Sequence, residues 1–340
     1  MHLLDRNEFQ FDLPEKCLNV LKKADPELMT HYTRDYTKNV KSIISEKIAE
    51  KFDIPEHNVL LGYGAEDLLK QLIHFYLKSG EKLLVPQNSW WYYQSIADEV
   101  GGITIQFPVH RTETEYVVYA DDLMKLYDQQ NPKVILIASP NNPTGNSLEI
   151  SDLEKIVSHC SSAFICIDEA YWGYQTGESQ HVKKFIEKYE NVVILRTFSK
   201  YYGIPGVRIG FGFISGKNEQ FIKFANRYLG YNRISEKLAI AAMESEDHYT
   251  KIREIMAEDK ERYYNELRSI PGVRVYITEA NFILIQIPEK SAPKLKKILE
   301  NQKILIKFLT EKGLENHLRI SLAPLAIGDK VRQAIMEAVS

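Results

Sequence analysis

Residues 197–210, TFSKYYGIPGVRIG, place a lysine close to two hydroxyls and an arginine. Lys200 follows Thr197 and Ser199, and Arg208 lies further along the same stretch. The amine of a lysine can form a Schiff base with an aldehyde, whereas hydroxyls and a guanidinium can hold phosphate oxygens. These side chains therefore suit a small molecule that carries both an aldehyde and a phosphate, as pyridoxal 5'-phosphate (PLP) does.

By itself this stretch is weak evidence for a cofactor site. A lone lysine near a strand end is usually a solvated surface residue, and a lone arginine is usually a surface charge. The interpretation gains weight only if other parts of such a site follow other strands of the chain.

A glycine turn, GYG at 62–64, lies between a short apolar strand at 59–61 and a helical pattern at 68–76. Strand, glycine turn and helix form an arrangement that cradles phosphate, because free N–H groups at a helix start bind anions. Here these groups are the amides near Ala65 and Glu66. Taken alone, a plain turn with carboxylates in the first helical turn is the simpler explanation.

Three further polar or aromatic segments follow apolar strands. The run NSWWYY at 88–93 has aromatic rings that either stack on a cofactor ring or join the core. The loop SPNNPTG at 139–145 is stiffened by two prolines and a glycine, so its amides are held in place. Asp168 and Glu169 follow a buried strand; a metal site is the alternative there, but no histidine cluster supports it, and we expect no metal.

Strands and helical stretches alternate up to residue 214, which favours a doubly wound α/β sheet. The polar segments fall after several strands, where the ligand site of such a sheet lies. No G-x-G-x-x-G follows the first strand, so a dinucleotide-binding fold is not indicated. Strands are predicted at 59–61, 83–86, 103–107, 133–138, 163–167, 191–195 and 209–214, and helices at 39–52, 68–76 and 151–158.

After Lys217 the chain turns mainly helical and then ends in a second set of strands. A long helical pattern at 235–268 has a break near 244–245. Strands at 273–276, 282–287 and 318–322 and a helix at 292–299 predict a smaller α+β domain. The predicted domains are an N-terminal arm at 1–30 that is part of the small domain, a large PLP-binding domain at 31–243 and the small C-terminal domain at 244–340.

Composition describes an ordinary globular protein of 340 residues, with 44% hydrophobic and 26% charged residues. A formal net charge of −3 gives no global field that favours nucleic acid or an anionic membrane. Three cysteines without a C-x-x-C pair fit a reduced, cytoplasmic setting better than a disulfide framework. The N-terminus does not read as a secretory signal, and no apolar run approaches the roughly 20 residues that span a bilayer.

Five motifs together resemble those of the class I/II, fold-type I PLP-dependent aminotransferases. They are SPNNPTG (139–145), DEAY (168–171), TFSK (197–200), GVRIG (206–210) and LRISLA (318–323), in that order. Within that family the chain is most similar to the histidinol-phosphate aminotransferases, and the resemblance covers nearly its whole length. It implies a large domain with a mostly parallel sheet plus a smaller α+β domain.

The resemblance also implies roles in holding the cofactor. Lys200 forms the Schiff base of the internal aldimine and later moves the proton between Cα and C4'. Asp168 pairs with the protonated pyridine nitrogen, which keeps the ring an electron sink. Tyr171 and Asn142 form hydrogen bonds with the ring's 3'-oxygen and thereby lower the pKa of the imine between lysine and cofactor. The phosphate is expected at the amides of Ala65 and Glu66 and at Thr197, Ser199 and Arg208, and the stacking ring is expected to be Trp90 or, with a less good spacing, Trp91.

The resemblance implies a shared site and a substrate-binding arginine as well. Tyr36 matches a tyrosine that reaches the phosphate in the other subunit, which predicts a homodimer. Arg319 matches the arginine that grips the substrate's anionic group in a bidentate way. A surface arginine at a strand edge is the alternative, but the LRIS context favours the substrate role.

Two departures from the family pattern affect the substrate. Lys307 stands where this branch has a second arginine for the substrate phosphate, and lysine lacks the planar fork. The family's N-E-N-P-x-G appears as NEFQF at 7–11, so only Asn7, which we include in the substrate site, and Glu8 are retained.

The sequence therefore predicts a PLP-dependent aminotransferase that takes an amino donor and a 2-oxo acid. Histidinol-phosphate:2-oxoglutarate transamination in histidine biosynthesis is the leading activity. One alternative is a PLP-dependent decarboxylase of the threonine-phosphate decarboxylase type, and another is transamination of a different amine. A PLP-binding regulator would need a DNA-binding region, and no basic segment stands out.

Overall fold

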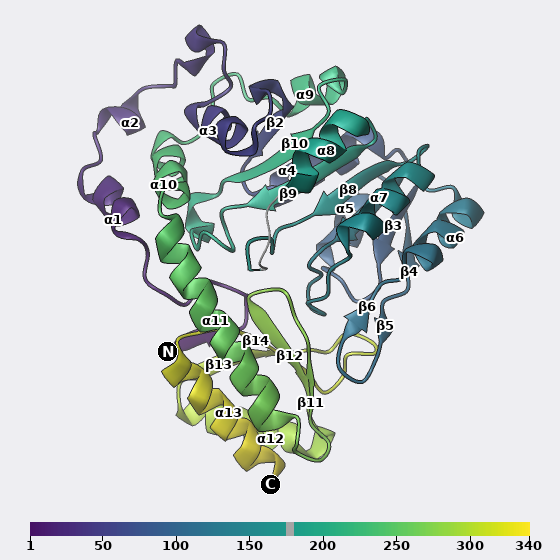
Figure 1. Cartoon of the computed structure of the whole chain (residues 1–340), viewed down its shortest axis with the longest axis vertical. Helices are drawn as coiled ribbons and strands as arrows, with labels where there is room; N and C mark the ends of the chain where they lie inside the picture. Colours follow the sequence, from purple (N-terminus) through teal and green to yellow (C-terminus); the bar gives the residue numbers. More distant parts are fainter. Residues whose placement is uncertain (175–179) are drawn as a thin grey trace.

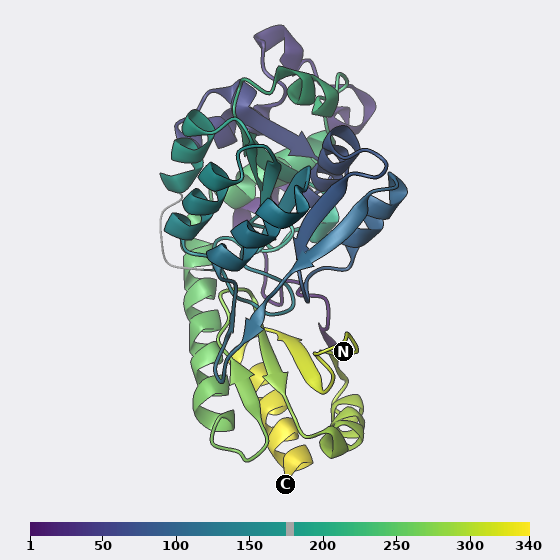
Figure 2. The ribbon, with the colours of Figure 1, turned by 90° about the vertical axis from the view of Figure 1, so that its right-hand side faces the viewer.

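The computed structural model describes residues 1–174 and 180–340, which form two main sheets with helices packed around them. The larger sheet lies in the upper part of Figure 1, and the smaller one lies below it. The long helix α11 (Glu246–Leu267) runs from the upper part down along the smaller sheet. Both chain termini lie in the lower part, with the smaller sheet (Figure 2).

In the described parts of the chain, the larger sheet has the strand order β2-β10-β9-β8-β7-β3-β4. Neighbouring strands from β9 to β4 are parallel, whereas β10 is antiparallel to both of its neighbours. The fold is therefore α/β with a mostly parallel sheet, which confirms the predicted fold class. The strands are β2 (Val59–Gly62), β3 (Lys82–Pro86), β4 (Ile103–Phe107), β7 (Val134–Ala138), β8 (Phe164–Asp168), β9 (Val192–Thr197) and β10 (Gly210–Ile214).

Helices cover both faces of this sheet, because alternate strand residues point to opposite sides. Ile165 and Ile167 of β8 share a core cluster with α3, α6, α7 and α8, whereas Cys166 packs with α4, α5 and α9. Burial on both sides explains why these strands read as continuous apolar runs. The helices are α3 (Ile43–Phe52), α4 (Ala65–Tyr76), α5 (Tyr92–Glu99), α6 (Ala120–Gln130), α7 (Ile150–His159), α8 (Gln180–Lys188) and α9 (Glu219–Ala225).

The helix predicted from residue 39 was placed too early, because α3 begins at Ile43. The Ser42 hydroxyl accepts from the Ile44 N–H at 3.1 Å, and the Ser45 hydroxyl accepts from the Ser42 N–H at 3.1 Å. This capping box satisfies amide groups that have no partner within the helix, and it sets the first helical residue.

The smaller sheet has the order β1-β13-β14-β12-β11, with β1 parallel to β13. The N-terminal strand thus pairs with a strand more than 300 residues away in sequence. The sequence analysis did not identify β1, β13 or α13, and the predicted domain boundaries stay predictions. The elements are β1 (His2–Leu4), β11 (Arg274–Tyr276), β12 (Phe282–Gln286), β13 (Ile304–Phe308), β14 (His317–Ser321), α12 (Ala292–Asn301) and α13 (Leu325–Val339).

A hairpin inserted after β4 joins the two sheets. It consists of β5 (His110–Arg111) and β6 (Tyr116–Val117), and it reaches down to the smaller sheet (Figure 2). Tyr116 packs on Tyr276 with ring centroids 4.9 Å apart, and its hydroxyl lies 3.2 Å from His317 Nε2. The hairpin covers one face of the smaller sheet, and Ile283 and Ile285 on the other face pack with the helices.

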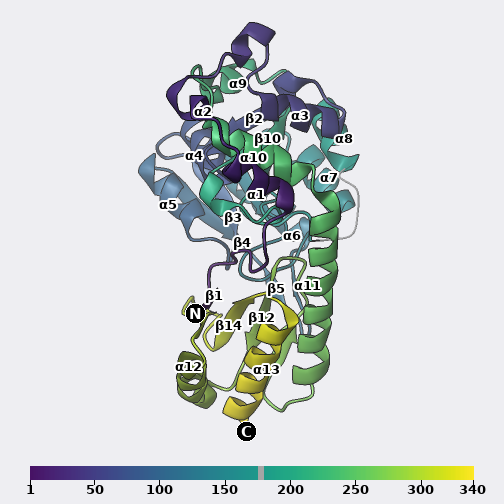
Figure 3. The ribbon, with the colours of Figure 1, turned by 90° about the vertical axis from the view of Figure 1, so that its left-hand side faces the viewer.

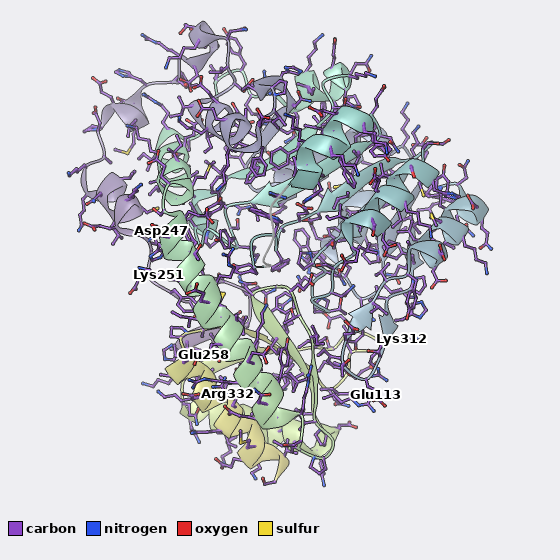
Figure 4. All side chains as sticks on the ribbon, in the orientation of Figure 1. Glu113, Asp247, Lys251, Glu258, Lys312 and Arg332 are labelled. Carbon is purple, nitrogen blue, oxygen red and sulfur yellow. The ribbon has the colours of Figure 1, made fainter. Side chains whose placement is uncertain are left out.

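The buried Arg332 ties α13 to α11, beside which it lies in Figure 4. Its guanidinium donates to Asp259 at 2.6 Å and to Glu266 at 3.0 Å. Such partners are required because a buried charge without them is strongly destabilising.

An arm of short helices connects the first strand to the larger sheet, and Figure 3 shows it passing upward from β1 through α1 and α2. Among the described residues, no helix has both the length and the apolar character needed to cross a bilayer. The remaining helices are α1 (Glu15–Lys22), α2 (Glu27–Thr30), α10 (Arg233–Met243), η1 (Asp35–Lys38), η2 (Glu56–Asn58), η3 (Pro205–Val207) and η4 (Glu289–Ser291).

Candidate active site

The parallel strands bring three predicted segments to one edge of the larger sheet. Ala138 of β7 is the register partner of Asp168 on β8, and Asp168 is the partner of Leu195 on β9. The loop 139–145, the turn after Asp168 and the segment with Lys200 therefore leave the sheet at the same edge. Ligands of open α/β sheets bind at this edge.

Lys200 lies where the N-terminal arm crosses the edge. Its Nζ donates to the backbone oxygens of Arg6 at 3.3 Å and Asn7 at 3.2 Å, and it lies 5.4 Å from the centre of the Tyr171 ring. The amine is thus within reach of both the arm and Tyr171. The sequence analysis did not foresee the contact between the arm's backbone and the lysine.

Asp168 is a buried carboxylate whose charge is not balanced. Its Oδ1 accepts from the Ala170 N–H at 2.9 Å, and its Oδ2 accepts from the Tyr93 hydroxyl at 2.7 Å. Burial raises the pKa of Asp168. Within residues 1–174 and 180–340, no cationic side chain pairs with this carboxylate. A protonated ring nitrogen would supply the missing charge, so this position fits a pyridine cofactor.

The neighbouring Glu169 shows the opposite situation. Its carboxylate accepts from Arg196 Nε at 2.7 Å and lies 2.6 Å from His181 Nε2. Although burial raises the pKa of Glu169, Arg196 and His181 hold it low, at about 2. Of two adjacent buried carboxylates, one is therefore neutralised by the protein itself and the other is left for a ligand.

An anion cradle forms at the start of α4. Gly64 precedes the helix with φ +86° and provides no side-chain cap, and the amides of Ala65 and Glu66 donate no hydrogen bond to the residues described. Arg208 Nη2 donates to the Tyr63 oxygen at 3.2 Å and lies 3.5 Å from the Glu66 carboxylate. Residues with a side chain rarely adopt the positive φ of Gly64, so glycine is favoured here.

The two predicted hydroxyls lie beside this cradle. Gly210 pairs with Thr197 across the sheet, and a Cβ on Gly210 would stand 2.1 Å from the Ala65 nitrogen. The Thr197 hydroxyl donates to Ser199 Oγ at 2.9 Å and accepts from the Ser199 amide at 3.1 Å. Amides, hydroxyls and a guanidinium thus converge, and this donor set fits a phosphate group.

Arg319 on β14 faces the cofactor edge from the smaller sheet. Its Nη1 donates to Asn142 Oδ1 and its Nη2 donates to the Asp5 backbone oxygen at 2.7 Å. Its Nε is buried and has no partner in the described part of the chain. Lys307 on β13 is its register partner and has an exposed side chain. Two cations therefore project from the same face of the smaller sheet.

Asn7 links the arm to the residues around Lys200. It is 1% exposed, and its Nδ2 donates to the Tyr171 hydroxyl at 2.8 Å. Its backbone oxygen accepts from Asn281 Nδ2 at 3.1 Å as well as from Lys200. Its Oδ1 is buried without a hydrogen-bond partner among residues 1–174 and 180–340.

Not every predicted residue joins this group. Tyr36 lies in η1 with 57% of its surface exposed, and its ring stacks on Tyr228 at 6.1 Å. Trp91 is 71% exposed, whereas Trp90 is partly buried and meets Tyr93 edge-on at 5.6 Å. Trp90 therefore contacts Tyr93, whose hydroxyl donates to Asp168.

Two residues of the site were missed by the sequence analysis. Tyr93 lies in the aromatic run that drew attention to Trp90, so the run itself carried a signal. Asp5 contributes only its backbone oxygen to Arg319. Any residue type provides such an oxygen, so the sequence cannot indicate this contact.

Comparison with known proteins identifies the family of the chain. The profile of the family described as aminotransferase class I and II matches residues 1–334, and the chain belongs to that family. A histidinol-phosphate aminotransferase of Ruminiclostridium cellulolyticum is 28% identical over 92% of this chain and 82% of its own length.

Solved structures share the fold. Histidinol-phosphate aminotransferase from Sinorhizobium meliloti in complex with PLP has a TM-score of 0.87 at 20% identity, covering 99% of this chain and 90% of that one. L-threonine-O-3-phosphate decarboxylase from Porphyromonas gingivalis has a TM-score of 0.80 at 17% identity, with 99% of each chain covered. The family assignment and the fit of the residues identify a PLP-dependent aminotransferase.

Proposed function

We propose that this aminotransferase transfers the amino group of histidinol phosphate to 2-oxoglutarate. The observation that carries the proposal is that Arg319 and Lys200 donate to backbone oxygens of the same short arm segment. Arg319 donates to Asp5, and Lys200 donates to Arg6 and Asn7. An anionic group held by Arg319 would leave the donor's amine facing Lys200. The curated relatives named histidinol-phosphate aminotransferase support this donor.

The bound cofactor supplies an electron sink for the bond that is broken at the substrate's Cα. We assign to Lys200 Nζ the covalent hold on the cofactor's aldehyde and the transfer of the proton at Cα. Asp168 would hold the positive charge of the ring nitrogen, and Tyr171 and Asn142 would donate hydrogen bonds to the ring's oxygen. Trp90 would cover the ring, and the cradle formed by Ala65, Glu66, Thr197, Ser199 and Arg208 would hold the phosphate.

The substrate side draws on three residues. Arg319 Nε, unpartnered among the residues described, adds a donor for the anionic group of each substrate. The Asn7 Oδ1 is a buried acceptor for a polar hydrogen of the donor molecule. Lys307 adds a second positive charge beside Arg319, which favours a phosphorylated donor over a neutral one.

We further propose a cytoplasmic homodimer. Tyr36 is exposed and its ring stacks on the exposed Tyr228, so the pair presents an apolar surface that an isolated chain would leave in water. A second copy of the chain would cover this surface and receive Tyr36 at its cofactor phosphate. The exposed side chains of this region are Met29, Tyr32, Tyr36, Tyr228 and Leu229.

Mixing experiments test the substrate assignment. The PLP-loaded protein is mixed in a stopped-flow spectrometer with histidinol phosphate, with glutamate, or with a panel of aromatic and phosphorylated amines. Rapid loss of the cofactor's visible band with histidinol phosphate, reversed by 2-oxoglutarate, is expected. Response only to another amine would overturn the donor, and release of carbon dioxide without a 2-oxo acid would identify a decarboxylase instead.

A further inference from the structure

The N-terminal arm contributes one side chain to the centre of the site, and that side chain is Asn7. The arm reaches this place through β1, whose residues His2–Leu4 pair with Ile304–Ile306 of the smaller sheet. Two hydrogen bonds to the Asn7 backbone oxygen, from Lys200 Nζ and Asn281 Nδ2, then hold the residue. The Asn7 side chain is therefore not needed to anchor the arm.

The Asn7 amide acts on the Tyr171 hydroxyl. Because Asn7 Nδ2 donates to that oxygen at 2.8 Å, one lone pair of the hydroxyl is occupied and its hydrogen must point elsewhere. Tyr171 is buried, so the hydrogen has few acceptors to choose from. A hydroxyl that accepts one hydrogen bond is also a stronger donor in the next, because bonds in a chain polarise one another.

We propose that Asn7 is a positioning residue that orients the Tyr171 hydroxyl toward the cofactor's ring oxygen and strengthens that hydrogen bond. The inference rests on the proposed function, in which Tyr171 donates to this oxygen. A donor at the ring oxygen favours the unprotonated form of the nitrogen that joins lysine and cofactor. The arm, which belongs to the smaller sheet, thereby influences protonation at the reacting nitrogen.

A simpler explanation is that Asn7 is present only for its backbone, and the test must separate the two. Asn7 has φ +55°, a left-handed conformation in which asparagine and glycine are favoured. The substitution Asn7→Gly keeps this conformation and the backbone oxygen that accepts from Asn281 Nδ2, and it removes the side-chain amide. Asn131→Gly is the matched control, because Asn131 has φ +46° and is exposed at the end of α6.

The readout is a pH titration of the cofactor's visible absorbance in the absence of substrate. We expect the midpoint of the titration to rise by about half to one pH unit in Asn7→Gly, the size of one neutral hydrogen bond. Asn131→Gly should titrate like the parent protein. In a Tyr171→Phe background, Asn7→Gly should cause no further shift, because the hydroxyl it orients is gone.

Other outcomes overturn the inference. An unchanged midpoint in Asn7→Gly, or an equal shift with and without the Tyr171 hydroxyl, would assign Asn7 a structural role only. If Asn7→Gly does not fold, Asn7→Asp replaces it: an acceptor then stands where the donor was, and a larger rise is expected. Failure of the proposed function is a separate result, because it would appear in the mixing experiments with histidinol phosphate and 2-oxoglutarate, whereas this titration contains no substrate.

Discussion

The proposed cofactor side and the proposed substrate side of the site are built in different ways. Asp168 and Thr197 end the adjacent parallel strands β8 and β9, and Lys200 lies just after β9, so strand pairing alone brings them together. Arg319 and Asn7 come from the smaller sheet and its arm, more than 300 residues apart, and reach the same space through backbone oxygens and Asn142. The cofactor side is therefore set within one sheet, whereas the substrate side depends on how two sheets meet.

This difference has a consequence for mutations. A change on the cofactor side should disturb the cofactor's absorbance and affinity, whereas a change at Arg319 or Lys307 should disturb the response to substrates and leave the cofactor unaffected. Asn7 is the exception on the substrate side, because its side chain donates to the Tyr171 hydroxyl. The four predictions below test that separation.

Lys200→Ala should have the largest effect. Loss of the amine removes both the covalent hold on the aldehyde and the group that moves the proton, so turnover should fall by at least about 10⁴-fold. Absorbance spectra of the purified variant with added PLP should lack the band of the lysine-bound cofactor. Lys183→Ala, at an exposed lysine, serves as the control; an unchanged band in Lys200→Ala would contradict the assignment.

Asp168→Asn should weaken PLP binding by about 10- to 100-fold, the value of one hydrogen bond to a charged group. The cofactor-free variant should nevertheless be more stable than its parent at pH 8. Burial raises the pKa of Asp168 in the folded chain above its value in the unfolded chain. As the pH rises, the unfolded chain therefore loses this proton first, and the free energy of unfolding falls. Asparagine has no such proton to lose.

Thermal melts of the cofactor-free proteins test whether Asp168→Asn raises the stability. The gain from Asp168→Asn should disappear below about pH 4, where the unfolded carboxyl is also protonated. Glu169→Gln provides the contrast: it leaves the buried Arg196 without its counter-charge and should cost about 3–5 kcal/mol at neutral pH. If both substitutions stabilise the cofactor-free protein, the distinction between the two carboxylates is wrong.

Arg319→Lys should test the substrate side alone. A lysine keeps the charge and loses the planar fork, so KM for the amino donor and for the 2-oxo acid should rise by about tenfold. The absorbance and affinity of the bound cofactor should not change. Arg274→Lys, on the exposed edge strand β11, is the matched control, and a loss of cofactor affinity in Arg319→Lys would mean that the two sides are not separable.

Lys307→Arg should have the smallest effect. An exposed ion pair contributes about 0.2–1 kcal/mol, so the planar guanidinium should lower KM for a phosphorylated donor by about two- to fivefold. KM for non-phosphorylated amines should stay the same. Steady-state kinetics with phosphorylated and non-phosphorylated donors test this prediction. An equal change in KM for both kinds of donor would show that Lys307 does not contact the substrate phosphate.

Much of the fold followed from local patterns. The apolar runs at 133–138 and 163–167 identified buried parallel strands because both of their faces are covered by helices. The strand β13 was not recognised, since the exposed Leu305 is apolar and breaks the apolar/polar alternation that marks a half-buried strand. The start of α3 was placed too early because the Ser42 cap depends on the hydroxyl of Ser45 rather than on apolar spacing.

By itself, the sequence determined the kind of chemistry at the cofactor side. Lys200, Asp168 and Arg208 stand in short motifs at or just after strands of one sheet. The residue types in these motifs and their order along the chain were therefore sufficient to predict a PLP site. Only the tertiary structure decided which neighbours these groups have. The bonds from Asn7 to Tyr171 and from Tyr93 to Asp168 span 164 and 75 residues, and contacts over such distances depend on packing that no local pattern records.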